Sequence, residues 1–322
     1  MRDFRFSFNI FGITNREAFA AECREAEEYG YDTVFAADHL GIPAPFPLLI
    51  AAAEATRRMR VGTLVLNVAF WNAALLAREV ATTDILTGGR LELGLGSGHM
   101  KWEFDTAGIG WHGPAARAAA LDQMIGELGR YFSTELPNPR PRPGRPVLQP
   151  LQRAGFGGYG PPLIVGGTSD AVLRIAARHA QTIGVAGLHQ VKGQPPGTFR
   201  LATAADVDER VAFAAACAGK RASEIEWHLL VQAVVITDDR RAAAEELVAE
   251  HRSEFEQLGV TDETAALTVT ETLESPFLLL GTPDEIAAQL RRSRERWGYS
   301  YITVHEPYMR LLAPVIDRLR GT

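Results

Sequence analysis

The sequence predicts an α/β fold, a (β/α)₈ TIM-like barrel with insertions in its loops. Segments with strand and helix patterns alternate along the chain, and strands such as TLVLNV are almost continuously apolar, which is typical of a parallel sheet covered on both faces. The 322 residues would fit two ordinary domains or one large barrel. Eight β-α units favour the barrel, because the strand order of a doubly wound sheet would have to break somewhere. We therefore expect one domain over residues 1–322.

The first unit shows both periods clearly. FRFSFNIF at 4–11 has polar residues at every second position and predicts a strand, while 15–30 has helical spacing and ends in Gly30. The other strands are expected at 33–37, 60–68, 90–96, 161–167, 181–187, 227–237 and 300–306. Helices are expected at 46–58, 73–89, 115–132, 169–179, 205–217, 239–258 and 308–320. An additional helix at 283–298 has proline in its first turn and precedes the last strand.

Three stretches rich in proline and glycine fit none of these units: 99–114, 138–162 and 189–199. In a barrel, we expect at least some of them to cover the active-site face. For 138–162, a long surface connection is an equally good interpretation.

Composition excludes several classes of function. The 33 basic and 39 acidic residues give a net charge of −6, which argues against a nucleic-acid partner. Cys23 and Cys217 are far apart, and neither a metal-ligand spacing nor clustered carboxylates predict a metal site. Neither a signal-peptide pattern nor an apolar run of about 18 residues is visible, so we expect a cytoplasmic protein without membrane contact.

In a barrel, function is sought at the carboxyl ends of the strands. Asp38 and His39 follow the second strand, where they could hold a ligand or transfer a proton. An aspartate that caps a turn beside a structural histidine would leave the same pattern. After the fourth strand, the run from Gly94 to His99 has three glycines at alternate positions, which let backbone approach a flat ligand or a phosphate. It is not a dinucleotide fingerprint, because we expect no helix directly after it.

The fifth strand ends in Gly166-Gly167-Thr168 and leads straight into a helix. Unpaired N–H groups and the helix dipole would favour an anion there, but a simple N-cap explains the same residues. The sequence has no nucleophile-elbow motif, so we expect no Ser/His/Asp catalytic triad.

Several motifs in order resemble the luciferase-like monooxygenase superfamily, and within it the branch of coenzyme F420-dependent oxidoreductases. The resemblance covers nearly the whole chain and is carried by EEYGYDTVFAADHL, RVGTLVLN, ALLAREVATTDILTGGRLELGLGSG, PPLIVGG and GTPDEIAAQL with GYSYITVHEP. It implies a barrel that binds a flavin or deazaflavin at its C-terminal face, and a homodimer.

The resemblance also implies residue roles. Asp38 and His39 match the acidic residue and histidine beside the ring system. Leu64-Val65 matches a non-prolyl cis peptide in a bulge of the third strand, behind the ring, and Asn67 matches the residue at the ring's edge. The remaining cofactor contacts implied are Gly96, Ser97 and Gly98 along the cofactor tail, and Gly166, Gly167 and Thr168 at the phosphate.

The chain departs from the family pattern at three places. Phe70-Trp71 stands where family members often carry Arg-His-Pro, and these aromatic rings could stack on a ligand or pack the loop. His99 stands where sugar-phosphate dehydrogenases of the F420 branch have a glutamate as proton donor, which disfavours such a substrate. Ser97 stands where FMN-dependent members can have an arginine, which favours F420.

These observations predict an F420-dependent oxidoreductase that transfers a hydride between the deazaflavin and a small organic substrate. His39 or His99 would supply the proton, since histidine titrates near neutral pH, with Asp38 as the next candidate. His305, after the eighth strand, is a weaker candidate. Two alternatives remain: an FMNH₂-dependent monooxygenase of the bacterial luciferase type, and a flavin-binding protein without catalysis.

Overall fold

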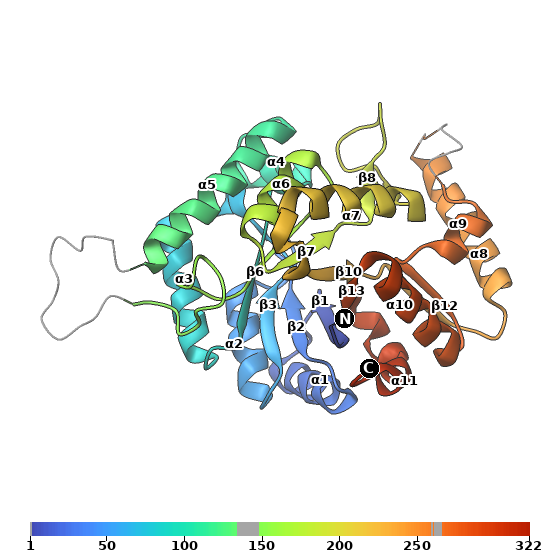
Figure 1. Cartoon of the computed structure of the whole chain (residues 1–322), viewed down its shortest axis with the longest axis horizontal. Helices are drawn as coiled ribbons and strands as arrows, with labels where there is room; N and C mark the ends of the chain where they lie inside the picture. The colour runs from blue at the N-terminus through green and yellow to red at the C-terminus, as the bar shows by residue number, and fades with distance from the viewer. Residues whose placement is uncertain (1, 134–147, 259, 261–265) are drawn as a thin grey trace, which may run out of the picture.

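The computed structural model describes residues 2–133, 148–258, 260 and 266–322, and its centre is a closed barrel of parallel strands (Figure 1). Pairing of β3 with β5 closes the barrel, so the expected fold class is confirmed. Eight strand positions of the described chain form it: β1 (Arg5–Ile10), β2 (Thr33–Ala36), β3 (Arg60–Thr63) continued by β4 (Leu66–Asn67), β5 (Leu91–Gly96), β6 (Leu163–Gly167), β7 (Thr182–Val185), β10 (Glu226–Leu230) and β13 (Tyr299–His305).

Helices surround the barrel in Figure 1, and most lie within two or three residues of the expected bounds. They are α1 (Arg16–Tyr29), α2 (Pro45–Ala55), α3 (Ala73–Leu86), α5 (Pro114–Phe132), α6 (Asp170–His179), α7 (Ala204–Ala218), α8 (Arg240–Gln257), α10 (Pro283–Trp297) and α11 (Met309–Leu319). A short helix, α9 (Val269–Glu274), was not expected.

Two expected strands are interrupted. The third is split into β3 and β4 by a cis peptide bond between Leu64 and Val65, at the place that the resemblance implied. The prediction of one strand over 227–237 is wrong, because β11 (Ala233–Ile236) leaves the barrel and pairs with β12 (Leu278–Gly281). The backbone switches partner at this point: Val231 N–H still donates to Thr303 of β13, whereas Gln232 N–H donates to Phe277.

The expectation of no helix after the glycine run is also wrong. Helix α4 (Lys101–Ala107) begins two residues after His99 and ends at Gly108, whose φ of 69° is left-handed. It buries Glu103 and Phe104. Two turns are too short to display a helical period in the sequence.

The proline-rich stretches lie at opposite ends of the barrel. The stretch 189–199 overlaps an antiparallel hairpin of β8 (Leu188–Gln190) and β9 (Phe199–Leu201), which follows β7 on the side of the carboxyl strand ends. The described part of 138–162 instead passes the amino end of β5, where Gln152 Nε2 donates to the carbonyl of Leu91. The surface-connection interpretation is therefore confirmed for 148–162, and residues 138–147 lie outside the described chain.

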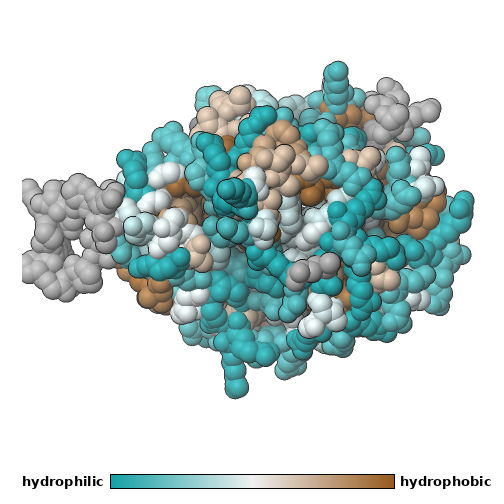
Figure 2. All heavy atoms as spheres, in the orientation of Figure 1, coloured by the Kyte–Doolittle hydropathy of each residue, from teal (hydrophilic) through white to brown (hydrophobic). Residues whose placement is uncertain are grey.

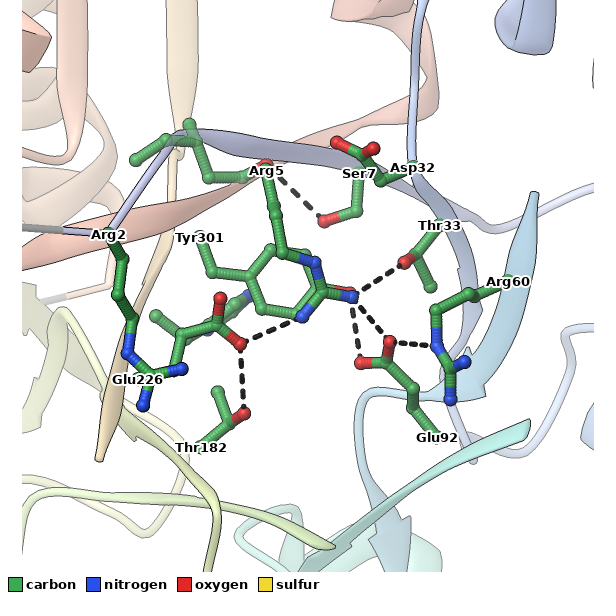
Figure 3. Close-up of polar contacts among 12 residues, drawn as sticks. Arg2, Arg5, Ser7, Asp32, Thr33, Arg60, Glu92, Thr182, Glu226 and Tyr301 are labelled. Carbon is green, nitrogen blue, oxygen red and sulfur yellow. Dashed lines mark hydrogen bonds and ion pairs between the residues drawn. The ribbon is translucent and has the colours of Figure 1, made fainter. Parts of the chain in front are cut away.

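A polar cluster fills the amino end of the barrel (Figure 3). Arg5 reaches Glu92 at 2.5 Å and Glu226 at 2.8 Å, and Arg60 Nε lies 2.5 Å from the same Glu92 carboxylate. Burial raises the pKa of Glu92, but the two guanidinium groups outweigh it and the pKa lies below its ordinary value. Because this end is packed with paired charges, a ligand has to enter from the opposite end.

The middle of the barrel is also filled. Phe35, Ile164 and Tyr301 pack together there, and His228 Nε2 lies 2.6 Å from Thr303 Oγ1. Inside the barrel, this layer separates the charged amino end from the carboxyl strand ends, where a ligand can approach the strands.

The outer surface gives no sign of a large apolar contact on the face shown in Figure 2, where hydrophilic residues predominate and apolar ones form small separate patches. Among the described helices, none has the length and apolar character needed to cross a bilayer.

Candidate active site

Asp38 is held by two donors at the end of β2. Its Oδ2 accepts the backbone N–H of Asn67 at 3.1 Å and the indole N–H of Trp71 at 2.9 Å. Burial raises the pKa of Asp38 despite these two hydrogen bonds. The carboxylate thus ties β2 to β4 and to the loop before α3, which makes it a positioning group for the rim of the barrel.

His39 forms a pair with a residue that the sequence did not point to. Its Nδ1 lies 2.9 Å from Glu103 Oε1 on α4, and the same oxygen accepts the backbone N–H of Leu40 at 3.0 Å. The Glu103 side chain is 2% exposed and that of His39 is 32% exposed. With Nδ1–H donating to the carboxylate, Nε2 is the nitrogen left to face a ligand.

His99 stands next to His39. The two ring centroids are 5.5 Å apart with perpendicular planes, and Phe199 of β9 lies 5.6 Å from the other side of His99. The pKa of His99 lies below its ordinary value, because burial and the nearby His39 disfavour the charged ring. The structure therefore brings together His39, His99 and Asp38, all three expected catalytic residues, on one side of the barrel mouth.

The glycines of β5 are required by the neighbouring strand. A Cβ on Gly96 would lie 2.6 Å from the Val65 side chain, and one on Gly98 would lie 2.6 Å from Asn67 Oδ1. The cis peptide segment and Asn67 therefore press directly on the β5 turn. This packing, rather than free space, explains glycine at 96 and 98 in the structure.

The turn after β6 differs from the β5 turn. A Cβ on Gly167 would clash with Val172 of α6 at 2.6 Å, whereas one on Gly166 would find its nearest atom at 3.8 Å. Ser169 caps α6 by accepting the N–H of Val172. A Cβ on Gly166 would therefore make only ordinary van der Waals contacts, and Gly166 and Thr168 are both partly exposed.

On the barrel strands, three polar atoms near the carboxyl ends are buried with no hydrogen-bond partner among the described residues. They are Asn9 Oδ1 on β1, Asn67 Nδ2 on β4 and His305 Nδ1 on β13. Asn9 and His305 are direct neighbours in the register of the two strands. Buried polar groups are nearly always hydrogen-bonded in folded proteins. A polar ligand at this place would supply the hydrogen bonds that these atoms lack.

A cavity of about 380 Å³ opens beside this site, lined by Asp38, His39, Trp71, Glu79 and residues 40–47, which include the first turn of α2. Another cavity, of about 420 Å³, lies between α5 and α6 next to Leu163 and Gln181, and so belongs to the amino ends of β6 and β7. The first cavity is the one that reaches the candidate catalytic groups. Among the described residues, no group of three or more metal-ligating side chains is found.

Comparison with known proteins identifies the family and relatives of several kinds. Residues 14–301 match the family model described as luciferase-like monooxygenase. An F420-dependent glucose-6-phosphate dehydrogenase of Nakamurella multipartita is 26% identical over 92% of this chain and 90% of its own. The 4-hydroxyprotoasukamycin monooxygenase of Streptomyces nodosus subsp. asukaensis is 26% identical over 90% of this chain and 78% of its own.

Solved structures share the fold at lower identity. A structure titled F420-dependent secondary alcohol dehydrogenase in complex with an F420-acetone adduct has a TM-score of 0.70 and 14% identity, and covers 99% of this chain and 98% of its own. The coenzyme F420-dependent tetrahydromethanopterin reductase of Methanopyrus kandleri has a TM-score of 0.66 and 17% identity over 99% of both chains.

Proposed function

Because this chain belongs to the luciferase-like monooxygenase family, we propose that it is an F420-dependent oxidoreductase acting on a small organic substrate. The observation that carries the proposal is the His39–Glu103 pair beside His99, at the open end of the barrel. The similarity to F420-dependent dehydrogenases over nine-tenths of the chain supports the choice of cofactor.

The residues at the mouth fit a deazaflavin. Its pyrimidine edge carries both carbonyl oxygens and an N–H group, which complement an orphaned amide donor on Asn67 and an orphaned acceptor on Asn9. The side chains of Leu64 and Val65 are partly exposed and give an apolar surface for a flat ring. Gly166 has no side chain to block a ring beside β6, and Thr168 with the first N–H groups of α6 would hold the tail phosphate.

When bound, F420 would supply a hydride donor or acceptor at C5 of the deazaflavin. The chain itself has to position the substrate, exclude water and move one proton. Glu103 orients the His39 ring so that Nε2 is free to take a proton from a substrate hydroxyl, or to return it to a carbonyl oxygen. His99 lies between His39 and Phe199 of the β8–β9 hairpin, where it would contact the substrate rather than the cofactor.

A second candidate is an FMNH₂-dependent monooxygenase, supported by the monooxygenase relative that aligns over 90% of this chain. Ser97 favours F420 over FMN, because no arginine is present there for a flavin phosphate. The two candidates are separated by titration with F420 and with FMN, each oxidised and reduced, followed by an oxygen-uptake assay. We expect F420 to bind more tightly; micromolar FMN binding without any response to F420 would reject the proposal.

A matched pair of variants ties cofactor binding to the mouth. Gly166→Ala puts a methyl group where the nearest atom is 3.8 Å away, so the protein should fold while its F420 affinity falls roughly tenfold or more. Gly129→Ala on α5, whose added methyl group meets no atom within 4 Å, serves as the control. If Gly166→Ala and Gly129→Ala bound F420 with equal affinity, the cofactor would not lie against Gly166.

Assembly and location complete the proposal. The resemblance supports a homodimer, and the composition supports a cytoplasmic protein. Light scattering after size-exclusion chromatography tests the first, where a mass near 35.1 kDa would indicate a monomer.

A further inference from the structure

Arg117 differs from the other cations near the barrel mouth, because no carboxylate in the described chain pairs with it. Lys101 reaches Asp105 at 2.6 Å, and Arg200 reaches Asp206 at 2.8 Å. Arg117 Nη1 donates to the carbonyl of His112, while its Nε is buried without any acceptor. The Nε and Nη2 edge of the guanidinium is therefore not used within the described residues.

Aromatic packing connects Arg117 to the candidate active site. Its guanidinium lies 3.8 Å from the ring centroid of Trp111, and Trp111 meets Phe104 edge-on at 4.8 Å. Phe104 follows Glu103 on α4, and α4 lies beside the amino end of α5 in Figure 1. The positive charge of Arg117 also contributes to the lowered pKa of His99, which shows that the two groups are within electrostatic reach.

We propose that Arg117 is the anchor for a carboxylate on the substrate, and that Trp111 carries the apolar part next to it. The proposal rests on the proposed function in one respect, namely that the mouth of the barrel is the substrate site. A guanidinium edge with two parallel N–H groups matches the two oxygens of a carboxylate, and an incoming carboxylate would supply the acceptor that Nε lacks. The stacked Trp111 holds the fork in one orientation, so little side-chain freedom is lost on binding.

The anchor also fits the placement of His99. A carboxylate held at Arg117 would leave the rest of a short substrate within reach of His99, because Arg117 is linked to α4 through Trp111 and Phe104 and acts electrostatically on His99. A neutral substrate would leave both the cation and its buried N–H without compensation. The structure thus favours a small acid that carries an oxidisable or reducible carbon.

Intrinsic fluorescence of the full chain tests the anchor with three probes: benzoate, benzyl alcohol and phenyl phosphate. We expect benzoate to quench the fluorescence and to bind at least tenfold more tightly than benzyl alcohol. The response should disappear in Trp111→Phe. Tighter binding of phenyl phosphate than of benzoate would overturn the carboxylate assignment in favour of a phosphate.

Arg117→Met keeps the length of the side chain and removes the fork, and should weaken benzoate binding at least tenfold. Arg117→Lys keeps the positive charge without the guanidinium fork. Its benzoate affinity should lie between those of the unaltered protein and Arg117→Met, which distinguishes loss of the anchor from misfolding. Arg130→Met on the same helix is the control, since the Arg130 side chain has a single partner among the residues that the structure describes, Glu127 at 3.9 Å. Unchanged benzoate affinity in Arg117→Met would overturn the proposal. F420 titration is a separate readout. If the unaltered protein did not bind F420, the proposed function would be wrong, and the benzoate titrations would still decide whether Arg117 binds a carboxylate.

Discussion

His39 Nδ1 and Glu103 Oε1 lie 2.9 Å apart, although 64 residues separate them in the chain. One residue follows β2 and the other lies on α4, after β5. A buried carboxylate behind an imidazole fixes the ring and its tautomer, so the pair behaves as one unit in which Glu103 positions His39.

We predict that His39→Ala lowers kcat by roughly 10²-fold or more, the scale of lost general acid-base catalysis, while F420 affinity falls less. Glu103→Gln should also lower kcat, because the amide can present its N–H to the ring and reverse the tautomer. Steady-state kinetics over pH 5–9 measure both. An unaltered rate and pH profile in both variants would show that the pair does not move the proton.

His99→Ala should act on the substrate side, raising KM while leaving F420 affinity near the original. Because the pKa of His99 lies below its ordinary value, the ring is neutral at pH 7, and any limb that it contributes to the rate profile lies on the acid side of 6.5. A limb that persists in His99→Ala must come from another group, and His39 would be tested next.

Stability should depend on pH through His228, which is fully buried and has its pKa lowered by burial to about 3 from 6.5. As pH falls below 6.5, the unfolded chain binds a proton at this position and the folded protein does not. The free energy of unfolding should therefore decrease toward pH 3, by up to about 1.4 kcal/mol per pH unit from this group. Denaturant titrations at several pH values check the slope, which should be shallower in His228→Gln. His251→Gln, on α8, is the control.

The charge cluster at the amino end of the barrel should be costly to break. Glu92→Gln leaves Arg5 and Arg60 facing an amide in place of a carboxylate, and we expect a loss of about 3–5 kcal/mol in the free energy of unfolding. Catalytic parameters of the folded fraction should change little, because Arg5 and Arg60 begin β1 and β3, whereas His39 follows the carboxyl end of β2. A change below 1 kcal/mol would mean that solvent already compensates these charges.

The sequence by itself determined the barrel. In each unit an apolar run indicates the strand, and the spacing of apolar residues with the capping residues indicates the helix. These signals are local, so they can be recognised without the structure. It also placed Asp38, His39 and His99 at strand ends, which any parallel barrel gathers at one mouth. Their roles remain predictions that the variants above test.

Tertiary structure alone decided which groups face one another. Glu103 pairs with His39, and Trp71 donates to Asp38, through contacts that cross 64 and 33 residues of sequence. The same is true of β11, whose residues look like a continuation of β10 but pair with β12 instead. Short elements such as α4 carry too few residues to show a period, and side-chain partners depend on the approach of distant segments. The short helix and the side-chain pairs both depend on tertiary packing, which a local sequence pattern does not encode.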